Sequence, residues 1–329
     1  MARIHYGDSL HRGLEEWFVA IFVRCSALSD GDCSPKNDTT IWHPICAGAF
    51  ISPWHALTAR HCVQKAPSRA YATPDVMVGY GTDCFVHVKV DESNLTRRDI
   101  VQPLGRRQDC DQDATNQKLL RVKNIFWPLD SYRDHHINKI VDEASHDFAI
   151  IELASTREDI CFACLPKNSE HYADDTIHII GQGRNAKHNN ADGPLQYLNI
   201  TDRTPNVAIR DGKALVWWNS QFKKGDAILG KFDDGAPYIR KRDGDSSQKV
   251  LFAYATRINS FYEQPSMAKN KEGEAVMVAG MVTSAVPFIC KMTGLCPDRD
   301  AYPPHNITAV GFNSIIYCTS FEKATETSG

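Results

Sequence analysis

The sequence predicts a chain built mainly from β-strands, because its apolar runs are short and patterned like strands. Trp17–Val23 and Val76–Tyr80 are short apolar runs, and Phe85–Val90 places valine at every second position. The stretch Cys46–Val63 holds two further short apolar segments, separated by a Ser-Pro turn signal. With 329 residues the chain is long enough for one large β domain or two medium ones.

His61 lies directly before the second cysteine of Cys46–Val63. A disulfide between Cys46 and Cys62 would close a small hairpin and hold the backbone of this histidine. A general base needs an imidazole on such a rigid element. The alternative is a structural histidine beside a structural disulfide. The whole stretch, spacing included, resembles the active-site histidine segment of trypsin-like (chymotrypsin-fold) serine proteases.

That resemblance implies an all-β fold of two packed antiparallel β-barrels, with the active cleft between them. It covers residues 4–296, with the first barrel at about 4–168 and the second at about 169–296. Residues 297–329 have no counterpart in the protease pattern, and we expect them to form a tail. The apolar run Ala275–Val282 is too short for a membrane span, and we expect it to belong to a packed C-terminal helix.

The composition favours a secreted protein and gives no sign of a nucleic-acid partner. The net charge is −3, and the basic cluster Arg240–Arg242 is short enough to be a solvated turn. Eleven cysteines without a zinc-finger spacing suggest disulfides and an oxidising compartment. Four glycosylation sequons agree with secretion, at Asn37, Asn94, Asn199 and Asn306.

The first residues carry no secretion signal, because the apolar run Trp17–Val23 follows two glutamates rather than a basic segment. We expect the signal and a pro-region to lie upstream of the residues shown. The alternative is an intracellular binding module with reduced thiols. Arg3-Ile4 resembles the family's activation site, where cleavage frees an amino terminus. Here Ile4 would fold inward to pair with Asp233, beside the nucleophile position.

Residues 91–120 are charged, and we expect a loop inserted relative to the family. Cysteines near two predicted loops suggest Cys25–Cys33 and Cys84–Cys110 bridges, although spacing leaves the connectivity open. Cys161 and Cys164 form a C-x-x-C pattern without the helix start of a redox site or a second pair for zinc, so structural disulfides are favoured.

The segment His146–Leu153 resembles the family's second landmark, which carries the catalytic aspartate. Asp147 begins an apolar strand, where an unpaired carboxylate would be costly. In the family this carboxylate orients the histidine. The alternative is an aspartate that only caps a turn. Ile177–Gly183 resembles the start of the second barrel, and a phosphate-binding loop there is disfavoured because no third glycine or helix follows.

The family's nucleophile motif is altered in this chain. In register with that motif, Phe232 to Pro237 places Asp234 at the serine position and Phe232 at an oxyanion-hole glycine. Ser246 follows Gly-Asp, but the predicted strand–turn–strand after the motif fits only if Asp234 is the motif position. We therefore expect Ser246 to lie at a turn.

A carboxylate at this position changes the expected chemistry. Attack of Asp234 on an amide would give an anhydride that collapses back to substrate. Flanked by Asp147 and Asp234, His61 is expected to be a charged ion-pair hub. A metal on these three groups is disfavoured because the two acids approach opposite sides of the ring. We expect no cofactor.

Further departures from the family pattern also indicate an inactive protein. No cysteine lies between Cys164 and Cys290, and Ile228 stands where trypsin-like members set the charge of the specificity pocket. The segment near Cys290 and Cys296 resembles a trypsin-like branch expanded in nematodes. The sequence thus predicts a secreted, inactive protease homologue that binds a protein or peptide in the cleft. The alternative is an active endopeptidase that uses Ser246 or another serine.

Overall fold

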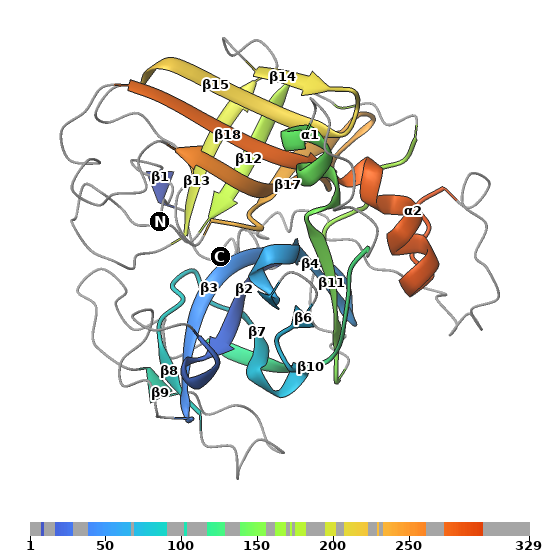
Figure 1. The fold of residues 1–329 in the computed structure, drawn as a ribbon. Coiled ribbons are helices and arrows are strands. Elements are labelled where there is room, and N and C mark those ends of the chain that lie inside the picture. Colours follow the sequence, from blue (N-terminus) through green and yellow to red (C-terminus); the bar gives the residue numbers. More distant parts are fainter. Residues whose placement is uncertain are drawn as a thin grey trace, which may run out of the picture.

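The protein forms two antiparallel sheets packed against each other, as predicted (Figure 1). The computed structural model describes residues 8–9, 17–28, 39–66, 69–90, 102–103, 117–128, 139–155, 162–168, 172, 175–181, 195–201, 207–222, 229, 233–260 and 273–298. Within these ranges strands predominate, and a helix follows the last strand. The predicted all-β, two-barrel fold with a C-terminal helix is therefore confirmed.

The first sheet lies in the N-terminal half of the chain. Its strands, with a small separate hairpin of β5 and β6, are β2 (Phe18–Arg24), β3 (Ile41–Ser52), β4 (His55–Ala59), β5 (Gln64–Ala66), β6 (Arg69–Ala70), β7 (Val76–Tyr80), β8 (Val88–Lys89), β9 (Gln102–Pro103), β10 (Lys118–Phe126) and β11 (Phe148–Leu153). Because β2 pairs with both β7 and β3, six of these strands close into a barrel. Closure leaves no exposed edge between β2 and β3.

The second sheet is open and curled. Its strands are β1 (Asp8–Ser9), β12 (Thr176–Gly181), β13 (Gln196–Thr201), β14 (Val207–Arg210), β15 (Ala214–Phe222), β16 (Pro237–Arg242), β17 (Asp245–Ser260) and β18 (Gly273–Met281). The short strand β1 pairs with β13 and so belongs to this sheet, although the predicted first barrel began at residue 4. Residues 8 and 9 therefore pair with the second sheet.

The expected helix over Ala275–Val282 is wrong, because this run is mostly strand. Residues up to Met281 form β18, which pairs with β15 on one side and β17 on the other. A strand buried between two neighbours is continuously apolar, and a short apolar run does not separate it from a helix. The helix α2 (Val282–Thr293) starts directly afterwards and ends at Gly294, in the left-handed conformation.

Two other predictions need correction. Only Val88–Lys89 of the expected strand Phe85–Val90 forms a strand, and the Phe85 ring packs on Phe18 and Phe22 in the core shared by the two sheets. The cluster Arg240–Arg242 is not a solvated turn. Arg240 is buried in β16, where its guanidinium lies 4.3 Å from the Tyr172 ring centroid.

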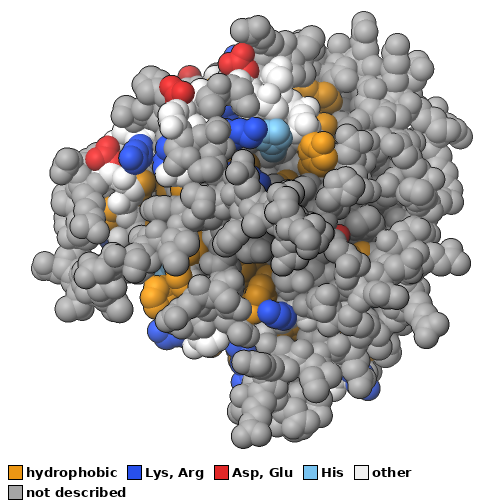
Figure 2. Space-filling view, turned by 180° about the vertical axis from the view of Figure 1, so that it is seen from behind, with side chains coloured by type: hydrophobic (Ala, Val, Ile, Leu, Met, Phe, Trp, Pro, Cys, Tyr) orange, Lys and Arg blue, Asp and Glu red, His pale blue; other side chains and the backbone are white. Residues whose placement is uncertain are grey.

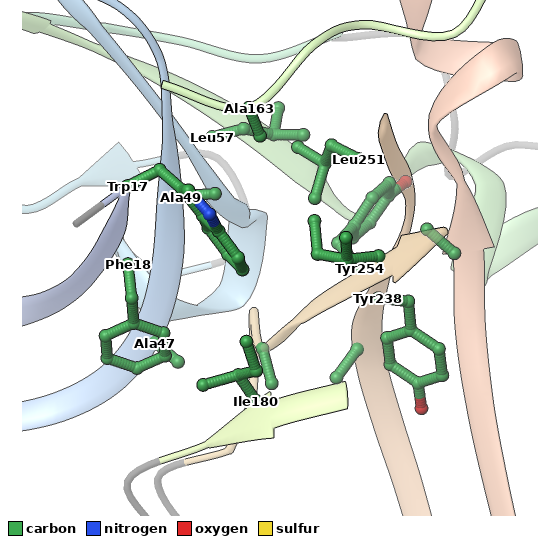
Figure 3. Packing of buried hydrophobic residues seen from close by; sticks show 14 of the residues in the cluster. Trp17, Phe18, Ala47, Ala49, Leu57, Ala163, Ile180, Tyr238, Leu251 and Tyr254 are labelled. Carbon is green, nitrogen blue, oxygen red and sulfur yellow. The ribbon is translucent and has the colours of Figure 1, made fainter. Parts of the chain in front are cut away.

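One hydrophobic core joins the two sheets. Figure 3 shows Trp17, Phe18 and Ala47 on one side of this core and Ile180, Leu251 and Tyr254 of the second sheet on the other. The helix α1 (Lys139–His146) packs on β18 and β15, so it covers the second sheet while leading into β11 of the first. This shared core fixes the two sheets relative to each other, and the candidate site lies where they meet.

The described surface mixes charges and apolar groups. On the face in Figure 2, lysine and arginine side chains are scattered among acidic and apolar ones rather than gathered in one field. Among the helices of the described ranges, none combines the length and apolar character needed to cross a membrane.

Candidate active site

Strand register brings His61 and Asp147 together. The antiparallel pair β4–β11 aligns Ala59 with Phe148, so the residue after β4 lies opposite the residue before β11. The backbone N–H of Arg60 donates to the Asp147 carbonyl oxygen at 3.0 Å and extends the pairing by one step. His61 follows in a short 3₁₀ helix, Arg60–Cys62. Two segments 86 positions apart thereby meet at one point.

The predicted disulfide between Cys46 and Cys62 is confirmed, with a Cα–Cα distance of 6.0 Å. Cys46 lies in β3, a wall of the closed barrel, and Cys62 is the last residue of the short helix that carries His61. The covalent link therefore anchors the histidine to the barrel from its C-terminal side. The strand β4 anchors it from the other side.

Asp147 binds His61 twice. Its Oδ2 lies 2.7 Å from Nδ1 of the ring, and its Oδ1 accepts the backbone N–H of His61 at 3.1 Å. A carboxylate that accepts from both the ring and the main chain fixes the ring orientation and keeps the proton on Nδ1. The other ring nitrogen, Nε2, therefore faces the position that the sequence predicts for the nucleophile.

The residue that the sequence predicts at the nucleophile position is Asp234, and its Oδ1 lies 3.6 Å from Nε2 of His61. Its backbone is held from both sheets. The Ala47 N–H in β3 donates to the Asp234 carbonyl oxygen at 2.8 Å, and the Gly235 N–H donates to the Ala255 carbonyl oxygen in β17 at 2.8 Å. The loop therefore bridges the sheets, and its side chain is aimed at the histidine.

Gly235 allows this close approach. Its φ is +78°, and a Cβ there would lie 2.2 Å from the Ala47 carbonyl oxygen and 2.5 Å from Thr58 Oγ1. Both atoms belong to the first barrel, and Thr58 Oγ1 itself donates to the Ala47 carbonyl oxygen at 2.7 Å. Only glycine combines this backbone conformation with the space available.

The two carboxylates set the charge of the ring. Removal from water opposes protonation, but Asp147 and then Asp234 outweigh it and raise the pKa of His61 well above its usual range. The side chain of His61 is 42% exposed, so solvent moderates these effects. The geometry favours an imidazolium that donates from Nδ1 to Asp147 and forms an ion pair with Asp234 through Nε2.

The comparisons with known proteins agree with this arrangement. The family model described as Trypsin matches residues 32–214, which is more than half of the chain. This chain belongs to the trypsin family. The match includes the segments of His61 and Asp147 and ends before Asp234.

A curated relative is the "Trypsin-like protease try-5" of the nematode Caenorhabditis elegans. It is 29% identical over 169 residues, which cover 49% of this chain and 45% of the relative. The chain therefore spans less than half the length of this trypsin-like protein. The trypsin family membership predicted from the sequence is confirmed by these two findings together.

The trypsin-family site has a brace that sequence analysis missed. The hydroxyl of the buried Tyr254 in β17 donates to the Ala144 carbonyl oxygen at 3.0 Å, and the same oxygen accepts the Asp147 N–H at 3.4 Å. Burial, and then the Asp147 charge, raise the pKa of Tyr254 well above its usual range. A Cβ at Gly280 would lie 2.3 Å from this hydroxyl. The apolar run around Tyr254 marks it as core, but nothing in the sequence indicates its partner.

Two consecutive residues of β17 therefore support the backbone next to Asp147 and next to Asp234. Tyr254 supports the carbonyl that fixes Asp147, and Ala255 accepts the N–H that follows Asp234. Asp233, the predicted partner of Ile4, is fully buried beside Tyr238, and burial followed by the Asp233 charge raises the Tyr238 pKa. Arg3, Ile4, Ile228 and Phe232 lie outside the described residues.

The backbone of Ser246 lies far along β17 from the Asp234 loop. Ser246 is the second residue of β17, nine positions before Ala255, which contacts the Asp234 loop. At about 3.3 Å per residue this strand separates the two by on the order of 25 Å, because a twisted strand is somewhat shortened. The prediction that Ser246 lies at a turn is wrong, since the turn is formed by residues 243–244 and Ser246 already belongs to β17.

The histidine and disulfide do not form a metal site. Ligand atoms of Cys46, His61 and Cys62 lie within 4.8 Å of one another, but both sulfurs are bonded in the disulfide and offer no thiolate. The carboxylates of Asp147 and Asp234 bind opposite nitrogens of the ring and do not converge. This donor set does not fit a metal ion.

The other cysteines divide into two groups. Cys290 in α2 and Cys296, three residues after its end, form a disulfide, and Cys25 and Cys84 are also disulfide-bonded. Cys33 and Cys110 lie outside the described residues. The expected disulfide at Cys164 is wrong. Cys164 keeps a thiol that contacts Gln248 Oε1 at 3.9 Å, and its backbone is hydrogen-bonded to Lys249 and Leu251 of β17.

Among the sequons, only Asn199 lies in the described residues. It is exposed in β13, and its Oδ1 lies 2.7 Å from His178 Nδ1 on the neighbouring strand. Asn37, Asn94 and Asn306 lie outside the described residues.

Proposed function

We propose that this chain is a secreted serine-protease homologue that has lost peptide hydrolysis and acts by binding. The observation that carries the proposal is the side chain facing His61 Nε2, which is the carboxylate of Asp234 rather than a hydroxyl. Asp147 and His61 keep the geometry of a catalytic pair, so the loss concerns the nucleophile and not the support around it.

Two chemical arguments support inactivity. A carboxylate that attacks an amide forms an anhydride, which expels the carboxylate far more readily than the amine leaves, so substrate is regenerated. In addition, a general base must be able to take a proton, and the acids on the two sides of His61 favour the imidazolium, which has no free nitrogen to accept one. Peptide hydrolysis at this site is therefore blocked twice.

The proposed partner is a protein or peptide that docks where the two sheets meet, beside His61 and Asp234. Both side chains keep exposed surface, 42% and 27%, so the charged pair is accessible to a ligand. Secretion is supported by the disulfides Cys46–Cys62 and Cys290–Cys296, since such bonds persist in oxidising compartments. Activation would place the new amino terminus of Ile4 near the buried carboxylate of Asp233, where a positive charge offsets the cost of burial.

The test is labelling with a fluorophosphonate probe of protein that begins at Ile4, beside the revertant Asp234→Ser. We expect no label on the wild type and labelling of the revertant. Adding His61→Ala to the revertant should abolish the label and show that it depends on the histidine. Labelling of the wild type, mapped to any serine, would favour an active endopeptidase instead. If neither protein is labelled, the site lacks more than its nucleophile, and the proposal in this form is wrong.

A further inference from the structure

The hairpin that joins β16 to β17 turns at an Asp–Gly pair. Arg242 and Asp245 are paired across the hairpin, and Asp243 and Gly244 form the two-residue turn between them. Both turn residues are exposed, and Gly244 has a φ of +75°. A Cβ built on Gly244 would meet no atom within 4 Å, so the space around this peptide bond is open.

The turn brings two reactive groups together. The backbone N–H of Gly244 donates to Oδ1 of Asp243 at 2.9 Å rather than to a neighbouring strand. The amide nitrogen therefore lies against the carboxyl group of the preceding side chain, the group that it would attack to close a five-membered ring. Glycine adds no side chain to hinder that approach.

We propose that Asp243 is a site of spontaneous isomerisation to isoaspartate. The Gly244 nitrogen attacks the side-chain carboxyl carbon, the new N–C bond forms, and the carboxyl hydroxyl leaves with the amide proton as water. The resulting succinimide then adds one water. Opening at the side-chain carbonyl restores aspartate, and opening at the main-chain carbonyl gives isoaspartate, in which the main chain runs through Cβ.

Two other Asp–Gly pairs in the described chain provide internal comparisons. In Asp234–Gly235 the glycine N–H is bonded to the Ala255 carbonyl oxygen at 2.8 Å and the glycine is buried, so its nitrogen is held away from the carboxyl group. Asp211–Gly212 is an exposed turn closed by the Lys213 N–H, and within the described contacts its glycine N–H does not reach the Asp211 carboxylate. The geometry therefore singles out Asp243.

Isomerisation would disturb more than the turn. The extra main-chain methylene breaks the alignment of Arg242 with Asp245, and the Arg242 guanidinium hydrogen-bonds both Gln248 Oε1 and the Leu165 carbonyl oxygen. Gln248 in turn contacts the Cys164 thiol. We expect the modified chain to lose this local network and to loosen the start of β17.

The experiment incubates the native full-length chain at neutral pH and maps isoaspartate by electron-transfer dissociation of its peptides. Enzymatic methylation by an isoaspartyl methyltransferase provides a second readout. We expect the Asp243 peptide to accumulate isoaspartate several-fold faster than the Asp211 and Asp234 peptides. In denaturant the three rates should converge, because the geometry that separates them is lost.

The variant Asp243→Glu tests the chemistry, since closing a six-membered ring is slower. It should remove the signal at this position and leave the rates at Asp211 and Asp234 unchanged. A native rate at Asp243 no greater than that at Asp211 would overturn the proposal. So would a difference that persists unchanged in denaturant, because the ranking would then follow from local sequence and not from the folded turn.

Discussion

The two sides of the candidate site are held by different means. On the first-barrel side, His61 is fixed by a disulfide, by the β4–β11 register and by two hydrogen bonds to Asp147. On the other side, the Asp234 loop is fixed by backbone hydrogen bonds to Ala47 and Ala255 and by the tight fit of Gly235. One side relies on a covalent link and side-chain contacts, and the other on main-chain contacts.

If Asp234 stands at the family's nucleophile position, as we propose, this difference explains how that residue can change while the site keeps its shape. Main-chain hydrogen bonds and a glycine define where Asp234 lies without using its side chain. A serine and an aspartate can occupy the same backbone. By contrast, His61 and Asp147 hold each other through their side chains, so replacing either one alters the support of both.

The largest expected effect comes from Gly235→Ala. The left-handed conformation costs an L-residue about 1–2 kcal/mol, and overpacking against the Ala47 carbonyl oxygen adds about 1–3 kcal/mol. We expect the free energy of unfolding to fall by about 3 kcal/mol in urea titration.

The matched control is Gly212→Ala, which has a φ of +65° and no atom within 4 Å of the new Cβ. It should lose only the conformational part, about 1 kcal/mol. Equal losses in the two variants would mean that the Asp234 loop is not held by close packing, and the comparison of the two sides would fail.

The disulfide that fixes His61 on the first-barrel side is tested by the double variant Cys46→Ala/Cys62→Ala. The bridge spans 16 positions, and loop-closure entropy for such a length is about 3 kcal/mol. Removing Cys290–Cys296, which spans 6, should cost less, about 2 kcal/mol. The informative readout is the NMR line shape of the His61 ring, which should broaden in the first variant and not in the second.

Part of this site was predictable from the sequence. The Cys46–Val63 stretch carried its disulfide, its hairpin and the place of His61, because spacing within a short segment determines which residues are neighbours. The motif around Asp147 indicated a strand start, and its register with β4 explains why it meets His61. Patterns of this kind are local in the sequence, so they predict contacts in the folded chain.

Other features depended on long-range pairing and were missed. The run Ala275–Val282 was expected to be helical and is a central strand, since only its neighbours β15 and β17 decide between the two. Tyr254 and Ala144 are 110 positions apart, and no motif links them. Arg240 was expected in a solvated turn, but aromatic side chains from Tyr172 and Phe252 cover its charge.

A smaller effect is expected from Tyr254→Phe, which removes the hydroxyl that donates to the Ala144 carbonyl oxygen. Loss of one hydrogen bond should lower the free energy of unfolding by about 1 kcal/mol. Because the same carbonyl accepts the Asp147 N–H, we also expect the His61 pKa to fall, as measured by NMR titration of the ring.

Tyr238→Phe is the control for this variant. Its hydroxyl is buried and makes no hydrogen bond within the described part of the chain, so its removal should be neutral or slightly stabilising. It should leave the His61 pKa unchanged. A fall in that pKa in both variants would point to general loosening of the second sheet and against a specific brace.

The smallest expected effect is a pH dependence of stability with opposite signs at two histidines. Because the folded-state pKa of His61 is raised, its contribution is complete below the unfolded value of about 6.5 and is lost as the pH rises through the folded-state value. The exposed ring keeps the contribution modest. His61→Gln should therefore flatten the decline in unfolding free energy above pH 6.5, and Asp234→Asn should reduce it.

His55 provides the contrast within the same barrel. Burial lowers the pKa of His55 to about 4, against a weaker opposing effect of Glu152, so the unfolded chain binds the proton more readily between pH 4 and 6.5. Stability should rise with pH in that window, and His55→Gln should remove the rise without altering the slope above it. If His61→Gln changed the slope only below pH 6.5, the ring would be neutral in the folded protein. The picture of an imidazolium between two carboxylates would then be wrong, because such a pair must hold its proton to higher pH.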